Sequence, residues 1–249
     1  MTSPPDTSPP DSVDSTSFPV TQVNKVKRVH ERGTYDKKAV YAILDAALVC
    51  HIAYVIDGRP FCTPTGFWRE GDHLYWHGSS ASRMIRNQKE GVDVCLTVTH
   101  LDSLVMARSG FHHSVNYRAV MAFGKAHIIS DPDVKLKLMD RFIDRIYPGR
   151  SGLIRQPNTQ EFKATTMIGM EIETASGKVR DKHVADEEED YAEVPAWSAL
   201  YPITQVLGEP SDCARQIPGL TRPDEMSDFV PGTRFDELMT KSYRRTFGG

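Results

Sequence analysis

Two hydrophobic periodicities alternate along the first two thirds of the chain. Runs in which apolar and polar residues alternate are typical of half-buried strands, whereas apolar residues three or four positions apart are typical of helices. Strands are predicted at Leu48–Ile56, Arg59–Trp68, His73–His77, Val92–Thr99, Leu104–Arg108, Tyr117–Ile129 and Ala164–Glu173. Helices are predicted at Lys37–Ala47, Ala81–Glu90 and Pro132–Tyr147, with a short one opening at the capping residue Asn158.

Turn residues separate these segments. Asp57-Gly58 between two strand-like runs is typical of a two-residue hairpin, and Glu70-Gly71-Asp72 marks a second turn. Short strands joined by hairpins, with helices between some of them, favour an antiparallel barrel over a doubly wound parallel sheet. We therefore predict a mainly β protein, an antiparallel barrel decorated by helices.

The two ends of the chain lack this patterning. Residues 1–20 contain five Pro, five Ser, three Asp and three Thr with little to bury, which predicts a disordered tail over residues 1–25. From Ala185 onward the periodicity fades into an acidic run, scattered prolines and isolated aromatic residues. We predict one barrel domain over residues 26–184, followed by an extended arm over residues 185–249 to which the pattern assigns no role.

Composition and charge narrow the class of protein. The 249 residues carry 30 Lys and Arg against 33 Asp and Glu. The chain therefore has no overall positive electrostatic field that would attract nucleic acid or an anionic membrane. The four cysteines form no CxxC pair, which argues against a zinc ribbon and a disulfide scaffold. The longest apolar stretch, Ala46–Ile56, is interrupted by His51 and too short to span a bilayer. With no apolar signal segment, we expect a soluble, cytoplasmic protein without nucleic-acid or membrane partners.

The most informative polar residues form the run His77-Gly78-Ser79-Ser80-Ala81-Ser82-Arg83-Met84. A strand ends at the histidine, the glycine permits a tight turn, and the serines lead into a predicted helix start. N–H groups at a helix N-terminus, serine hydroxyls and a guanidinium can converge on one phosphate. A serine-rich turn with a surface arginine fits the same residues, and the spacing alone does not separate these interpretations.

Two further segments are candidates for binding. Phe61-Cys62-Thr63-Pro64-Thr65-Gly66 interrupts a predicted strand, so its backbone either faces the edge of a planar heteroaromatic ring or forms an ordinary edge strand with a bulge. The second segment, Ala107–Arg118, contains two His, an Asn, a Tyr and two Arg between apolar strands. We expect such a polar segment either to bind a ligand or to cross an interface. The sequence has no GxSxG, P-loop or GxGxxG motif, and we identify no metal ligand and no catalytic residue from it.

In combination, these segments resemble a known family. The chain is similar to the flavin-nucleotide-binding branch of the pyridoxamine 5′-phosphate oxidase-like split barrels, which is related to the nitroimidazole-resistance reductases. The resemblance extends over residues 28–197. It rests on the runs Glu31–Asp36, His77–Met84, Arg108–Arg118 and Ala175–Arg180, and on the acidic run before Tyr191.

The resemblance implies a homodimeric, six-stranded antiparallel split β-barrel, the FMN-binding split barrel, with FMN at the subunit interface. Its implied cofactor-binding residues are Pro64, Thr65 and Gly66 at the isoalloxazine edge; His77 and Gly78 beside the ribityl chain; Ser79, Ser82 and Arg83 in the phosphate-binding run; and Asn116, Tyr117, Arg118, Lys178 and Trp197 with contributions from the partner subunit.

The implied activity is that of an FMN-dependent oxidoreductase that passes a hydride between NAD(P)H and a small acceptor through flavin N5. Met84 replaces a lysine of the oxidase, and the oxidase's C-terminal Trp/Arg-rich segment is not found, so pyridoxamine 5′-phosphate oxidation itself is not expected. The alternative is a non-catalytic split barrel that holds flavin or haem for sensing or storage; haem would require an axial histidine facing an open pocket. His112 and His113 are candidate proton donors near the flavin, or else they hydrogen-bond across the dimer.

Overall fold

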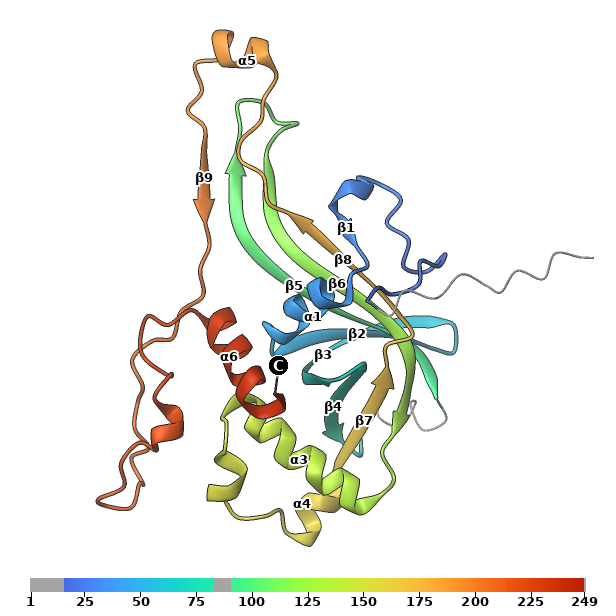
Figure 1. Cartoon of the computed structure of the whole chain (residues 1–249), viewed down its shortest axis with the longest axis vertical. Helices are drawn as coiled ribbons and strands as arrows, with labels where there is room; N and C mark the ends of the chain where they lie inside the picture. Colours follow the sequence, from blue (N-terminus) through green and yellow to red (C-terminus); the bar gives the residue numbers. More distant parts are fainter. Residues whose placement is uncertain (1–15, 83–90, 249) are drawn as a thin grey trace, which may run out of the picture.

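The computed structural model describes residues 16–82 and 91–248, which form one nine-stranded sheet with helices around it (Figure 1). The strands are β1 (Gly33–Thr34), β2 (Val49–Ile56), β3 (Arg59–Glu70), β4 (His73–Ser79), β5 (Val92–Met106), β6 (Ser114–Ile128), β7 (Thr165–Glu171), β8 (Thr174–Arg180) and β9 (Ala199–Pro202). The helices are α1 (Lys37–Asp45), α3 (Pro132–Ile146), α4 (Thr159–Ala164), α5 (Glu188–Glu193) and α6 (Phe235–Phe247). Short 3-10 turns lie at His30–Arg32, Arg150–Leu153 and Asp224–Met226.

Six of the strands close into a ring. Strand β6 pairs with both β5 and β7, and the path β5–β2–β3–β4–β7 joins its two ends. Every pairing in the sheet is antiparallel. This confirms the predicted six-stranded antiparallel split barrel, to which β1, β8 and β9 add further strands. The homodimer remains a prediction, because the structure contains one chain.

The β2–β3 hairpin has the predicted tight turn. Ile56 pairs with Arg59, and the two residues between them have positive φ angles, 50° at Asp57 and 75° at Gly58. Asp-Gly suits a two-residue hairpin because both central positions of such a turn favour residues that tolerate positive φ.

Strands β5 and β6 form a long hairpin that extends beyond the ring (Figure 1). The predicted break between Thr99 and Leu104 is wrong, because β5 continues through it with a shift of register between Leu101 and Ser103. A bulge of this kind bends a strand without ending it. The outer part of the hairpin pairs with β8 on one side and β9 on the other.

Helix α1 packs one face against the barrel core and leaves Lys38 and Ala42 exposed; its N-cap Asp36 accepts a hydrogen bond of 2.7 Å from the amide of Ala39. Val40, Ile43 and Leu44 of this helix are buried in the main hydrophobic cluster. The predicted disordered tail is too long at its C-terminal end, because Phe18 is 3% exposed and packs against α1. Among the helices in the described parts of the chain, none combines the length and apolar character needed to cross a membrane.

The C-terminal segment is more structured than the predicted extended arm. Helix α6 lies against α3, burying Leu238 and Tyr243 (Figure 1). The buried guanidinium of Arg145 on α3 donates hydrogen bonds to three carbonyl oxygens: Met239 O at 2.9 Å, Asp45 O at 2.5 Å and Ala47 O at 3.2 Å. One side chain therefore links α3 to α6 and to the end of α1.

Candidate functional site

A cavity of about 430 Å³ opens between β3 and the end of β4. Its lining residues are Tyr54, Phe61, Thr63, Pro64, Thr65, His77, Gly78 and Ser82. The structure thus brings together five residues that the sequence predicts as cofactor-binding, from two segments whose chemistry was inferred separately.

Strand pairing explains why this cavity exists. Strand β4 pairs with β3 only over His73–Trp76, opposite Phe67–Glu70. The last residues of β4, from His77 to Ser79, pair with β7. Residues 59–66 of β3 pair with β2 on one side, and no described strand pairs with their other edge. Pro64 in this stretch lacks a backbone N–H, as expected where a strand lies at an edge. The exposed backbone edge and the hydroxyl groups of Thr63 and Thr65 therefore face an open space.

An aromatic pair forms one wall of the cavity. The rings of Tyr54 and Phe61 are stacked, with centroids 5.7 Å apart and planes at 14°, and the Tyr54 hydroxyl lies 3.0 Å from Oγ1 of Thr63. Phe61 and Thr63 belong to the segment predicted to bind, although they are not among the individually predicted cofactor-binding residues, and Tyr54 was not predicted. The register of the predicted hairpin indicates that Tyr54 lies beside this segment, because Tyr54 and Phe61 are cross-strand partners in it.

His77 lies between this cavity and a second one. Its Nδ1 is buried without a hydrogen-bond partner, and its ring meets Phe142 of α3 edge-on at 4.5 Å. Burial lowers the pKa of His77 below its ordinary value of 6.5, so the imidazole is neutral at pH 7. The second cavity, of about 450 Å³, extends from His77 to the exposed Arg155–Glu161 ion pair.

Two predicted residues lie beside the first cavity without lining it. A Cβ atom at Gly66 would come within 3.3 Å of the Phe142 ring, so glycine here permits α3 to approach β3. The Ser79 hydroxyl, at the exposed end of β4, accepts a hydrogen bond of 3.3 Å from the amide of Ala81. Arg83 and the predicted helix that follows it lie outside the described residues.

The remaining predicted residues lie elsewhere in the same chain. Asn116 is buried, where its side chain accepts from Arg180 and donates to the Lys182 carbonyl at 3.0 Å. Lys178 donates to the carbonyl of Arg28 at 3.4 Å, and Trp197 is 70% exposed. Tyr117 on β6 pairs across the sheet with Leu101 and with Arg180. Their predicted contact with a partner's cofactor remains a prediction.

His112 and His113 lie at the tip of the β5–β6 hairpin, where both interact with Ser109. Nδ1 of His112 is 2.8 Å from the Ser109 hydroxyl, and Nδ1 of His113 is 2.7 Å from its carbonyl oxygen. Donor atoms of His112, Asp186 and Asp190 lie within 4.8 Å of one another. Asp186 already accepts from the Arg108 amide at 2.9 Å and its guanidinium at 3.2 Å, so this group anchors the tip.

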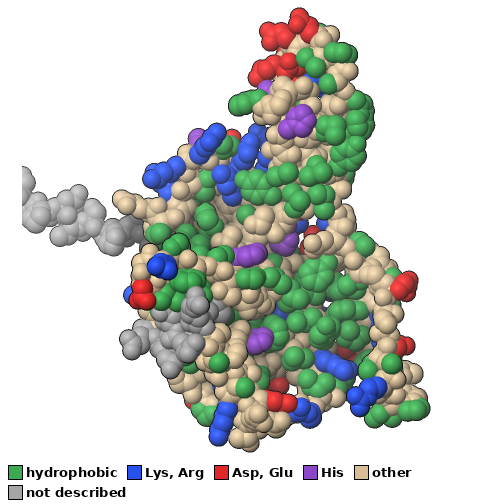
Figure 2. Space-filling view, turned by 180° about the vertical axis from the view of Figure 1, so that it is seen from behind, with side chains coloured by type: hydrophobic (Ala, Val, Ile, Leu, Met, Phe, Trp, Pro, Cys, Tyr) green, Lys and Arg blue, Asp and Glu red, His purple; other side chains and the backbone are tan. Residues whose placement is uncertain are grey.

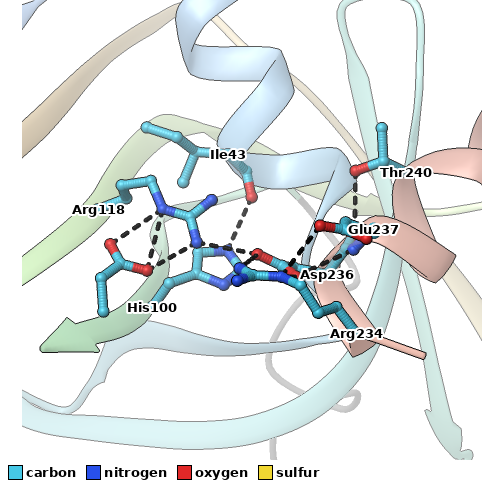
Figure 3. Close-up of polar contacts among 8 residues, drawn as sticks. Ile43, His100, Arg118, Arg234, Asp236, Glu237 and Thr240 are labelled. Carbon is cyan, nitrogen blue, oxygen red and sulfur yellow. Dashed lines mark hydrogen bonds and ion pairs between the residues drawn. The ribbon is translucent and has the colours of Figure 1, made fainter. Parts of the chain in front are cut away.

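A third cavity, of about 500 Å³, lies between the outer side of β2 and β5 and the C-terminal segment. Seven apolar residues, two histidines and seven other polar or charged residues line it: Ala46, Ala47, Leu48, Val49, His51, Thr99, His100, Leu101, Asp102, Arg118, Ile203, Thr204, Gln205, Arg234, Phe235 and Asp236. Nε2 of His100 is 3.1 Å from the carbonyl oxygen of Ile43, as Figure 3 shows. This cavity could not be recognised from the sequence, because one wall comes from the C-terminal segment, to which the sequence pattern assigns no role.

A network of ion pairs closes the rim of this third cavity (Figure 3). The Arg118 guanidinium binds Asp102 at 2.7 Å and Asp236 at 3.2 Å. Arg234 binds Asp236 at 3.0 Å and Glu237 at 3.1 Å. The network therefore joins β5 and β6 to the first turn of α6.

The ring of strands and the cavity at its edge define a split-barrel protein. A family model described as pyridoxamine 5′-phosphate oxidase matches residues 36–179, and the chain belongs to this family. No curated protein sequence matches the chain.

Two solved structures resemble nearly the whole described fold. The flavocytochrome Anf3 of Azotobacter vinelandii is 40% identical, with a TM-score of 0.79 over 84% of this chain and 97% of that one. The FAD and haem binding protein of Mycobacterium smegmatis is 30% identical, with a TM-score of 0.76 over 82% of this chain and 98% of that one. Both extend beyond the region that the family model matches, so they include C-terminal residues as well as the barrel.

Proposed function

We propose that this protein is a flavin-binding redox protein that also carries haem, in the manner of the two relatives described as binding such cofactors. The observation that carries the flavin assignment is the convergence of Pro64, Thr65, His77, Gly78 and Ser82 on one cavity. When bound, the flavin supplies hydride and electron transfer, which no protein side chain performs alone. The electron donor in this proposal is NAD(P)H, and the acceptor is haem or a small molecule.

The residues of the first cavity suit the part of the cofactor that FMN and FAD share. The free edge of β3 offers backbone groups to the polar edge of the ring system, and Tyr54 and Phe61 offer an apolar wall. Ser82 and the backbone at Gly78 provide polar groups for the ribityl chain and first phosphate. FMN is the cofactor that the sequence resemblance implies, whereas the M. smegmatis relative is described with FAD.

We also propose that two copies of the chain associate through the outer side of β5 and β6. Several apolar residues on or near these strands are well exposed: Leu101, Leu104, Phe111, Val115, Met121 and Trp197. Figure 2 shows a largely hydrophobic face in which histidines are set. Exposed apolar patches of this kind mark association surfaces. Light scattering after gel filtration tests the dimer directly.

Haem is the second component of the proposal because the third cavity has the required chemistry. Seven of its sixteen lining residues are apolar, and His51 and His100 are among the others. Neutral imidazole is a common iron ligand. Haem would require an axial histidine facing an open pocket, and the two histidines that line this cavity support the proposal.

The decisive experiment is the absorption spectrum of the purified full-length protein, followed by mass spectrometry of the cofactors that heat releases. We expect flavin and haem bands together, with FMN or FAD identified by mass. Thr65→Phe, which places a ring in the first cavity, is expected to abolish flavin uptake, whereas His127→Phe, at an exposed position of β6, is the matched control. A folded Thr65→Phe protein with normal flavin content would overturn the assignment of this cavity.

A further inference from the structure

The third cavity contains two histidines in different chemical situations. His100 holds its Nε2 against the Ile43 carbonyl oxygen, which fixes the ring against the end of α1. His51 is exposed on β2 and has no hydrogen bond among the described contacts. Both ring nitrogens of His51 are therefore accessible, and ligation through either would break no interaction of the fold.

The position of His51 on the strand directs it to the outer side of the barrel. Its neighbours Cys50 and Ile52 are fully buried in the core, and side chains alternate between the two faces of a strand. Val49 lies two residues away on the outer face, and Thr97 is the cross-strand partner of His51 on β5. His51 therefore stands among small or apolar residues, which leave a planar ring room to approach the imidazole.

The C-terminal segment supplies the opposite wall. Ile203 and Phe235 line the cavity, and the ion-pair network at Asp236 fixes this segment to β5 and β6. The guanidinium of Arg234, whose side chain is 44% exposed, lies at the rim (Figure 3). A slot that combines apolar residues with an exposed histidine and has an arginine at its rim suits a flat ring that carries carboxylates at one edge.

Four other histidines satisfy these conditions less well. His112 and His113 are engaged with Ser109, and His77 lies in the first cavity against Phe142. His127 is exposed on β6 and lines none of the three cavities described above.

We propose that His51 is the axial ligand of haem bound in the third cavity, between β2, β5 and the C-terminal segment. This inference rests on the proposed function, because it takes haem as the occupant. In this arrangement His51 donates a nitrogen lone pair to the iron, and Ile203 and Phe235 keep water from the ring. A propionate at the rim competes with Asp236 and Glu237 for Arg234. His100 then has a positioning role at the end of α1.

The test is a titration of full-length protein with hemin, followed by absorption and electron paramagnetic resonance spectroscopy. His51→Ala and His100→Ala are compared with wild type, and His127→Ala is the control for loss of an exposed strand histidine. We expect His51→Ala to bind hemin at least about tenfold more weakly, with a changed ligand-field spectrum, since even indirect partners of metal ligands contribute that much. Added imidazole should restore the wild-type spectrum to His51→Ala.

The outcomes separate this inference from the function on which it rests. A wild-type spectrum and affinity in His51→Ala, or loss of the axial ligand in His100→Ala instead, would overturn the assignment of His51 and leave haem binding intact. Failure of the flavin-loaded wild-type protein to bind hemin would overturn the haem component of the proposed function itself. Flavin content, measured for every variant, shows whether the barrel has folded.

Discussion

The guanidinium of Arg69 binds the carboxylate of Asp45 at two points, Nε to Oδ1 at 2.9 Å and Nη2 to Oδ2 at 2.6 Å. Both side chains are at most a tenth exposed. The pair joins β3 to the end of α1, and Arg69 lies over the rings of Tyr41 and Tyr243, at 4.0 and 4.7 Å from their centroids. The barrel, helix α1 and the C-terminal helix therefore meet at one buried ion pair.

Asp45→Asn should strongly destabilise the fold. The substitution keeps the shape of the side chain but leaves the buried Arg69 without a counter-charge, and breaking a buried pair in this way costs about 3–5 kcal/mol. Urea unfolding of the cofactor-free protein measures the loss. Lys241→Gln, which removes an exposed ion pair with Asp228, is the control and should change stability by less than about 1 kcal/mol. Equal effects of the two substitutions would contradict the buried pair's role.

Gly124→Ala tests the closure of the ring between β6 and β7. A Cβ atom at this position would lie 2.1 Å from the carbonyl oxygen of Glu171, so the backbones must separate to admit it. Overpacking of this kind typically costs about 1–3 kcal/mol. Gly110→Ala is the matched control, because a Cβ there meets no atom within 4 Å. Thermal melting of both variants measures the difference, and we expect a lower melting temperature for Gly124→Ala than for Gly110→Ala. An unchanged melting temperature in Gly124→Ala would show that the ring of strands tolerates a wider gap between β6 and β7.

The barrel could be predicted from sequence because its signals are local. The Asp57-Gly58 turn fixes the β2–β3 register, and that register places Pro64 and Thr65 at the strand edge. The bulge beside Ser103 could not be predicted, because the polar residues there resemble a loop while cross-strand bonds to β6 hold the strand together. Helix α6 was missed because its buried side, at Leu238, Met239, Ser242 and Tyr243, is recognisable only once α3 is there to cover it.

The third cavity shows the same limit for function. Its two walls come from residues about 150 positions apart in the chain, so no motif contains it. The first cavity could be predicted because each half is a short run with its own chemistry, and the fold needs only to bring the two runs together.

His77 should make stability depend on pH. Burial lowers its pKa below 6.5 in the folded chain, so between the two pKa values the unfolded chain binds more protons than the folded one. The native state is therefore fully favoured above about pH 6.5 and loses stability as the pH falls toward the lowered pKa. His77→Gln removes this contribution, so the free energy of unfolding of wild type minus that of the variant should decrease from pH 7.5 to pH 5. The same comparison with His127→Gln controls for loss of an exposed imidazole. A difference that stays constant with pH would contradict a depressed pKa at His77.

Arg118 has two candidate roles that one pair of variants can separate. The structure engages it with Asp102 and Asp236, whereas the sequence resemblance assigns it to the partner subunit's flavin. Arg118→Gln and Asp236→Asn both break the link to α6, so both should make residues 203–234 more susceptible to limited proteolysis. If Arg118 also binds the flavin of a partner subunit, only Arg118→Gln should weaken flavin affinity, by about tenfold or more, the value of one charge-assisted hydrogen bond. We expect this split, measured by fluorescence titration of flavin into the cofactor-free protein. Equal flavin affinities in the two variants would restrict Arg118 to holding the C-terminal helix on the barrel.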